Sequence, residues 1–143
     1  MRARTATVGD LEFVFNSLSK RLSEEYLAAG IEAQAVQDRL TMNLKEGRAH
    51  SLLDKEGNVI AIIAWHEDDV AHTLFAARET FFSASTVRFC RRHIRRIQAL
   101  AGNRPFHHWS RLDHPDVAKW FRIIGFVEKH EQPGSILFEL PPA

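Results

Sequence analysis

Residues His114 to Glu131 read HPDVAKWFRIIGFVEKHE. From Pro115 to Ile124, apolar residues recur at helical spacing, and the proline stands in the first turn, where a helix does not need its missing N–H. Gly125 ends this helix, because glycine adopts the left-handed conformation at a helix C-terminus without strain. The residues from 126 to 131 then predict a strand. This stretch therefore predicts a helix that leads through one glycine into a strand.

The remainder of the chain predicts strands and helices that alternate irregularly around this unit. In chain order, the expected elements are a strand over 2–8, helices over 11–28 and 32–47, strands over 51–53, 59–65 and 70–77, a helix over 85–100, a strand over 105–112, the helix over 115–124, and strands over 126–131 and 135–140. The order is β-α-α-β-β-β-α-β-α-β-β. Such a mixture of hairpins and crossover helices predicts an α+β protein with a mixed central sheet, in a single domain over residues 1–143.

The totals narrow the class of protein. The 143 residues are 45% hydrophobic and 26% charged, with a net charge of +1, which makes a nucleic-acid partner unlikely on charge alone. Cys90 is the only cysteine, so no internal disulfide can form and a reducing compartment is expected. The longest apolar run, Val59 to Trp65, is far shorter than the roughly 18 residues of a membrane span. We expect a cytoplasmic protein with no membrane partner; the sequence leaves its oligomeric state open.

The element order and the C-terminal unit resemble the GNAT (Gcn5-related N-acetyltransferase) fold, that of acyl-CoA N-acyltransferases. Members often carry Asn-x-x-Ala-x-x-x-Tyr-x-x-x-Gly-Phe in this helix. Gly125 and Phe126 match the pattern, whereas His114, Val117 and Phe121 replace its Asn, Ala and Tyr. The resemblance implies that the Tyr protonates the departing coenzyme thiolate. Phe121 has no proton to give.

A second GNAT signature is a glycine-rich loop before the long helix, where backbone N–H groups approach the coenzyme pyrophosphate. Here the segment from Ala77 to Phe89 reads ARETFFSASTVRF and has no glycine. Phe81 and Phe82 are bulky there; if exposed, they suggest a partner surface or a plug in the coenzyme cleft. The resemblance implies acetyl-CoA or CoA as a weakly supported cofactor, at Phe75, Ala76, Ser83, Ala84, Ser85, Thr86 and Arg88.

The chain more narrowly resembles the small GNAT-like internal virion or scaffold-like proteins of T7-like bacteriophages. That resemblance covers most of the chain, including RLDHPDVAKWFRIIGFVEKHE and the basic stretch before it. It implies an eroded acetyl-CoA site and a role in binding or virion assembly, with virion or host proteins as partners, in the host cytoplasm or the virion. The alternative is an active acetyl-CoA-dependent N-acyltransferase acting on an amine, in which a water or His72 replaces the missing donor.

Other polar residues offer weaker candidates. His72 and Glu67 lie near a predicted turn and could act as acid or base, although turns are polar without any function. His107 and His108 are neighbours on a predicted strand, so they point to opposite faces and cannot readily bind one metal. No zinc spacing is present, and no metal is expected.

The long helix predicted over 85–100 has one strongly basic face. Its arginines could bind the 3′-phosphate of coenzyme A, a nucleic-acid backbone or an acidic protein patch, although a solvated face is the more frequent reason for such a pattern. The face consists of Arg88, Arg91, Arg92, Arg95 and Arg96.

Overall fold

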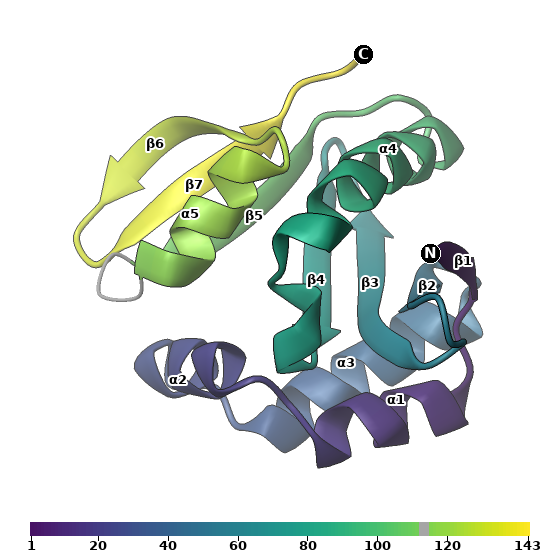
Figure 1. Cartoon of the computed structure of the whole chain (residues 1–143). Coiled ribbons are helices and arrows are strands. Elements are labelled where there is room, and N and C mark those ends of the chain that lie inside the picture. Colours follow the sequence, from purple (N-terminus) through teal and green to yellow (C-terminus); the bar gives the residue numbers. More distant parts are fainter. Residues whose placement is uncertain (112–114) are drawn as a thin grey trace.

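Seven strands of the described part form one mixed sheet, with helices on both faces (Figure 1). The structure is a computed structural model and describes residues 1–111 and 115–143. The strands are β1 (Arg2–Thr5), β2 (Ala49–Leu53), β3 (Val59–Glu67), β4 (Ala71–Ala77), β5 (Phe106–Arg111), β6 (Val127–Gln132) and β7 (Ser135–Leu140). They lie in the order β1-β2-β3-β4-β5-β7-β6, and only β4 and β5 pair in parallel. The predicted α+β class with a mixed sheet is confirmed.

The helices divide between the two faces. They are α1 (Val8–Asn16), α2 (Lys20–Ala28), α3 (Ala33–Lys45), α4 (Ala84–Leu100) and α5 (Pro115–Ile123), with a short 3₁₀ turn, η1 (Glu79–Phe81), before α4. On β2, Ser51 bonds to Asp10 of α1, while its neighbour His50 bonds to His93 of α4. Because neighbouring side chains of a strand point to opposite faces, α1 and α4 cover opposite faces of the sheet.

The helix expected over 11–28 is two helices, α1 and α2, and the prediction of one was wrong. The break falls at Ser17 to Ser19. The N–H of Ser19 donates to the carbonyl of Ala77 at 2.8 Å, and its hydroxyl donates to Glu79 at 2.7 Å. These bonds reach about 60 residues along the chain, so the apolar periodicity continues across a break that only tertiary contacts produce.

The start of α1 is fixed by Thr7, which is its N-cap residue. The Thr7 hydroxyl accepts from the N–H of Asp10 at 3.1 Å, and the Asp10 carboxylate accepts from the N–H of Thr7 at 3.0 Å, which is a capping box. Asp10 is buried and also accepts from Arg4 at 3.0 Å and Ser51 at 2.7 Å. Desolvation opposes ionisation of Asp10, but these donors outweigh it and hold the pKa of its carboxyl below the usual value.

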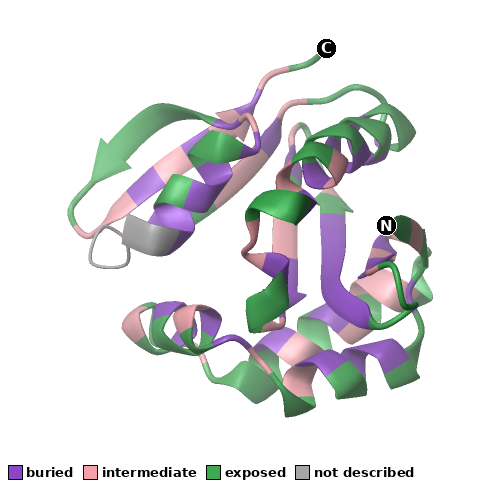
Figure 2. Cartoon of the chain, viewed as in Figure 1, coloured by how far each residue is buried: buried purple, intermediate pink, exposed green. Residues whose placement is uncertain are grey.

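The core lies along β3. Every residue from Val59 to Trp65 is buried, as expected for a central strand with helices on both faces, and Figure 2 shows β3 almost entirely in the buried colour. Burial of each valine or isoleucine side chain in this run contributes about 1.5–3 kcal/mol.

The strand pairing in the sheet is shortest between β4 and β5. Their parallel pairing covers only Ala71 with Phe106 and His72 with His107, whereas β3 and β4 pair along the whole of β4. Beyond His72 the two strands no longer pair. This divergence opens a wedge between β4 and β5 and leaves one edge of β4 without a ladder partner. The candidate site lies along this open edge of β4.

Candidate functional site in the wedge between β4 and β5

The unpaired edge of β4 presents three carbonyl groups, and each accepts a hydrogen bond from outside the sheet ladder. The partners are His108 Nδ1 for Thr73 at 3.4 Å, the Tyr26 hydroxyl for Phe75 at 2.8 Å, and the Ser19 N–H for Ala77 at 2.8 Å. The alternation arises because every second residue of a strand directs its backbone groups to the same edge. Two side chains, Tyr26 of α2 and His108 of β5, and the backbone of Ser19 just before α2 thus satisfy the carbonyls of this open edge.

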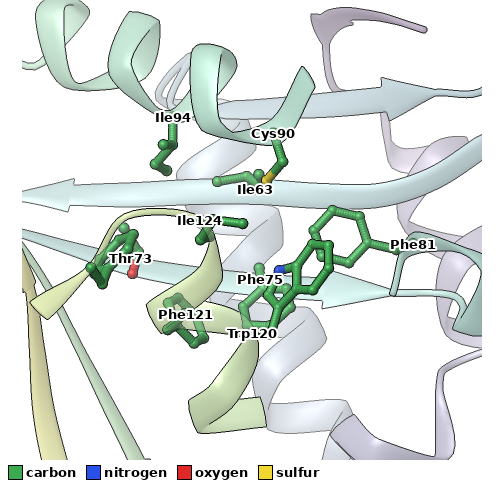
Figure 3. Close-up of a pocket in the computed structure, with 10 residues that line it drawn as sticks. Ile63, Thr73, Phe75, Phe81, Cys90, Ile94, Trp120, Phe121 and Ile124 are labelled. Carbon is green, nitrogen blue, oxygen red and sulfur yellow. The ribbon is translucent and has the colours of Figure 1, made fainter. Parts of the chain in front are cut away.

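A small apolar cavity lies behind this edge, among β3, β4, α4 and α5 (Figure 3). Its volume is about 20 Å³, enough for one water-sized group. Six of the side chains that enclose it are Thr73, Phe75, Phe81, Cys90, Trp120 and Phe121.

Phe81 forms part of the cavity wall and is not a partner surface. Its ring is 1% exposed, with its centroid 5.0 Å from that of Trp120 and 6.0 Å from that of Phe75. Phe82 is partly buried and lies 5.4 Å from Trp120 on the outer side. The aromatic pair before α4 therefore narrows the cavity from the side where a glycine-rich loop would leave it open.

Among the described residues that line the cavity, Trp120 contributes the only buried side-chain nitrogen or oxygen without a hydrogen-bond partner. It is 6% exposed, and its Nε1–H is buried without a hydrogen-bond partner in the described part of the chain. The Thr73 hydroxyl is not free, because it donates to the carbonyl of His107 at 3.3 Å. A buried donor without a partner costs about 1–3 kcal/mol, so the cavity favours a group that brings a hydrogen-bond acceptor.

Phe121 is 4% exposed and packs where the sequence suggested, beside the cavity. The ring of His108 stacks on it with centroids 4.0 Å apart. The backbone at Phe121 is held as well: the N–H of Phe126 donates to its carbonyl, and Gly125 takes a φ of 113° that a side chain would strain. His114, which stands at the Asn position of the motif, lies outside the described residues.

Nδ1 of His108 lies against Thr73. With the proton on Nδ1, this atom donates to the carbonyl of Thr73 at 3.4 Å and Nε2 keeps its lone pair; with the proton on Nε2, Nδ1 accepts from the Thr73 hydroxyl at 3.3 Å. Nε2 makes no hydrogen bond with the described residues. Desolvation lowers the pKa of His108 to about 4, against a smaller opposing effect of the bond to Thr73, so the ring is neutral at physiological pH.

The residues at the start of α4 lie at a separate hollow of about 450 Å³. Ser83 and Ser85 line it and bond to each other at 3.0 Å, while the Thr86 hydroxyl is occupied by the carbonyls of Phe81 and Ser83. The 54–56 loop, with Lys55 between two acidic residues, forms its other wall. The first N–H groups of α4, together with two serine hydroxyls, are thus available to an anion.

The five arginines of α4 are exposed on one face, as the spacing predicted. Four of them, together with Ile124 and Gly125, line a further hollow of about 450 Å³; these are Arg91, Arg92, Arg95 and Arg96. Arg88 is exposed nearer the start of the helix, one turn after Ala84.

The weaker acid–base candidates lie away from the cavity. Glu67 accepts from the indole of Trp65 at 3.1 Å and pairs with Arg48 at 3.5 Å. His72 is exposed on the opposite face of β4 from Thr73. Of the predicted coenzyme-binding residues, Phe75 is the one that lines the cavity. The neighbouring Ala76 is buried and pairs with Ile62 of β3.

The described residues contain neither a group of metal-ligating side chains nor a helix that could span a membrane. No three His, Cys, Asp or Glu side chains lie close enough together there to hold a metal ion. No helix in that part of the chain combines the length and the apolar character that a bilayer crossing requires.

No protein-family model and no curated protein matches the chain by sequence. Comparison of the structure with solved structures does find similar folds. Among solved structures, it is similar to PaiA N-acetyltransferase from Thermoplasma acidophilum in complex with coenzyme A, with a TM-score of 0.74 and 11% identity over 99% of this chain and 98% of that one. It is also similar to spermidine N-acetyltransferase from Vibrio cholerae with CoA and spermine, with a TM-score of 0.64 and 15% identity over 96% and 92%. A GNAT phosphinothricin acetyltransferase from Sinorhizobium meliloti with AcCoA gives 0.65 and 12% over 99% and 88%. The chain has the GNAT fold.

These neighbours overturn the expectation of a non-catalytic virion protein. The three solved structures named above are N-acetyltransferases, and none of them supports the narrower bacteriophage resemblance. That expectation rested on two missing signatures, the glycines and the tyrosine. Their loss leaves the divergence of β4 and β5 intact, because it depends on strand pairing and on α2 contacts.

Proposed function

We propose that this chain is an acyl-CoA-dependent N-acyltransferase that moves a short acyl group to an amine. The observation that carries the proposal is the wedge between β4 and β5, with an apolar cavity behind it whose unpaired polar group is the indole N–H of Trp120. Fold alone does not assign an activity, so the proposal rests on this site.

The residues present fit an acyl thioester. Its carbonyl oxygen is an acceptor of the kind that the buried Trp120 N–H needs, and a cavity of about 20 Å³ admits a group as small as the methyl of an acetyl. The thioester, when bound, supplies an activated acyl carbon. The backbone N–H of Phe75 faces the same open edge as its carbonyl and offers a second donor.

The start of α4 fits the phosphates of the coenzyme. The first N–H groups of the helix and the hydroxyls of Ser83 and Ser85 would hold them, with Lys55 across the hollow. Small residues here take the place of the glycines. Arg88, further along the same helix, adds positive charge.

A calorimetric titration with acetyl-CoA, followed by a thiol-release assay over a panel of amines, tests the proposal. We expect micromolar binding, and about tenfold weaker binding for Ser85→Glu, because a carboxylate at the start of α4 repels phosphate. Ser23→Glu on the exposed side of α2 is the matched control and should bind as the unchanged protein does. No heat of binding, together with no thermal stabilisation at millimolar acetyl-CoA, would refute the proposal.

A further inference from the structure

His108 sits at the apex of the wedge, directly after the last paired residues of β4 and β5. Its Nδ1 is fixed on Thr73, and its ring lies flat on Phe121 and 5.8 Å from Phe75. Three neighbours on β4 and α5 therefore determine where its second nitrogen lies.

The other proton-carrying groups around the wedge are occupied. The hydroxyl of Tyr26, the only tyrosine, donates to the carbonyl of Phe75, and burial together with the charge of Glu25 raises its pKa. The Thr73 hydroxyl donates to His107. Cys90 is buried, and desolvation raises the pKa of its thiol to about 12. In the tautomer that donates from Nδ1 to the Thr73 carbonyl, His108 Nε2 is left as an acceptor without a partner in the described part of the chain.

We propose that His108 Nε2 carries the proton in the transfer reaction and replaces the hydroxyl that Phe121 lacks. This inference rests on the proposed function. As the bond between the amine nitrogen and the acyl carbon forms and the carbon–sulfur bond breaks, Nε2 takes the proton that the nitrogen loses. It returns that proton to the sulfur, so the products are an amide and a free thiol, and His108 ends neutral as it began.

The properties of the ring suit this role. The amine nitrogen becomes acidic once it is bonded to the acyl carbon, which lets a weak base accept its proton. Protonated His108 is then a strong acid relative to a thiol, whose pKa is near 8.5, and it releases the proton to the sulfur. A neutral ring at rest also leaves the lone pair ready in nearly every molecule.

The test compares His108→Asn with His130→Asn. Asparagine can keep a donor near the Nδ1 position while Nε2 is removed, and His130 is exposed on β6, away from the wedge. We expect kcat to fall about 10²–10³-fold in His108→Asn, with the acetyl-CoA Kd within about twofold of the unchanged protein. His130→Asn should change neither. His108→Gln, with its amide nitrogen near Nε2, is the second variant in case the first folds poorly, and it should lose kcat similarly.

A readout independent of turnover is the ring tautomer, observed by long-range ¹H–¹⁵N spectra of the full chain without ligand. We expect the proton of His108 on Nδ1 at neutral pH. A proton on Nε2, or a kcat within threefold of the unchanged protein in folded His108→Asn, would overturn the inference while leaving the proposed function standing. Failure of the unchanged protein to acetylate any amine would instead refute the proposed function, and this inference with it.

Discussion

The imidazole of His108 lies almost parallel to the ring of Phe121, with 4.0 Å between centroids and 15° between planes. One ring comes from β5 and the other from α5. The contact keeps water from one side of the imidazole. Phe121 stands where GNAT enzymes often carry a tyrosine, and His108 is the described histidine that stacks on it.

Phe121→Leu should therefore raise the pKa of His108. Leucine keeps the apolar character but covers less of the imidazole, so water reaches it and the charged form becomes less costly. We expect the pKa to move from about 4 toward 6.5 by about one unit, measured by NMR titration of the ring. An unchanged pKa would show that other groups cause the desolvation.

Trp120→Phe should weaken acetyl-CoA binding about tenfold, because it removes the one unpaired side-chain donor of the cavity. Any loss of stability in the free protein should come from packing of the smaller ring against Phe81 and Phe82, since the indole N–H has no hydrogen bond there to lose. Trp109→Phe is the control, because Trp109 is 40% exposed on β5. Calorimetry measures the affinity and thermal unfolding the stability; equal affinities in the two variants would contradict a role for the indole N–H.

The thiol of Cys90 should be inert in the folded protein. It is buried on α4, and desolvation raises its pKa to about 12, so at neutral pH the reactive thiolate is rare. An aromatic disulfide reagent should release no chromophore from native protein within minutes, and one equivalent after unfolding in guanidinium. Rapid native labelling would mean that the α4 face opens readily.

Asp10→Ala should destabilise the protein by about 3 kcal/mol. The change removes the capping box and the ion pair with Arg4, and it leaves the buried hydroxyl of Ser51 without its acceptor. Urea unfolding measures the effect. Asp38→Ala is the matched control, because the exposed Asp38 bonds only to Gln34 on its own helix; it should cost less than about 0.5 kcal/mol.

Stability should fall as the pH is lowered from 6.5 to 4, because of the histidine pair His50 and His93 that joins β2 to α4. His50 Nδ1 and His93 Nε2 lie 3.0 Å apart. Desolvation, aided by the charges of His50 and Arg96, lowers the pKa of His93 to about 4, and desolvation also lowers that of His50.

The two histidines bind protons near pH 6.5 in the unfolded chain but only at lower pH in the folded chain. Their contribution to stability is therefore fully present above pH 6.5 and is lost as the pH falls. We expect a loss of about 2–3 kcal/mol from this pair by pH 4.5, measured by urea unfolding. His93→Leu should reduce the loss, and His130→Asn should not. Equal pH dependence in all three proteins would contradict the assignment.

The sequence predicted the frame of the molecule because periodicity reports local structure and burial. The helix, glycine and strand from residue 115 to 131 appear as expected, and so does the arginine face of α4. The break between α1 and α2 could not be seen, because Ser19 is held by residues about 60 positions away.

Less of the candidate site than of the fold could be predicted from the sequence. The sequence indicated Phe121 and Phe75, but His108 was weighed only as a metal ligand. Strand alternation places it on the face shared with the buried Phe106 and Ser110, which was the available signal. Its partner Thr73 and its stacking on Phe121 depend on how β4, β5 and α5 come together, which no local pattern encodes.

The short seam of two residue pairs between β4 and β5 also separates two antiparallel ladders of the sheet, β1 to β4 and β5 with β7 and β6. The exposed turn at Gly102 and Asn103 lies just before β5, so cutting there leaves a four-stranded fragment with α4 and a three-stranded fragment with α5. Each fragment keeps its own antiparallel ladders, and the wedge exists only where they meet. Mixing the two fragments would then assemble the site from halves, so that acyl transfer could report on whether two fused proteins associate.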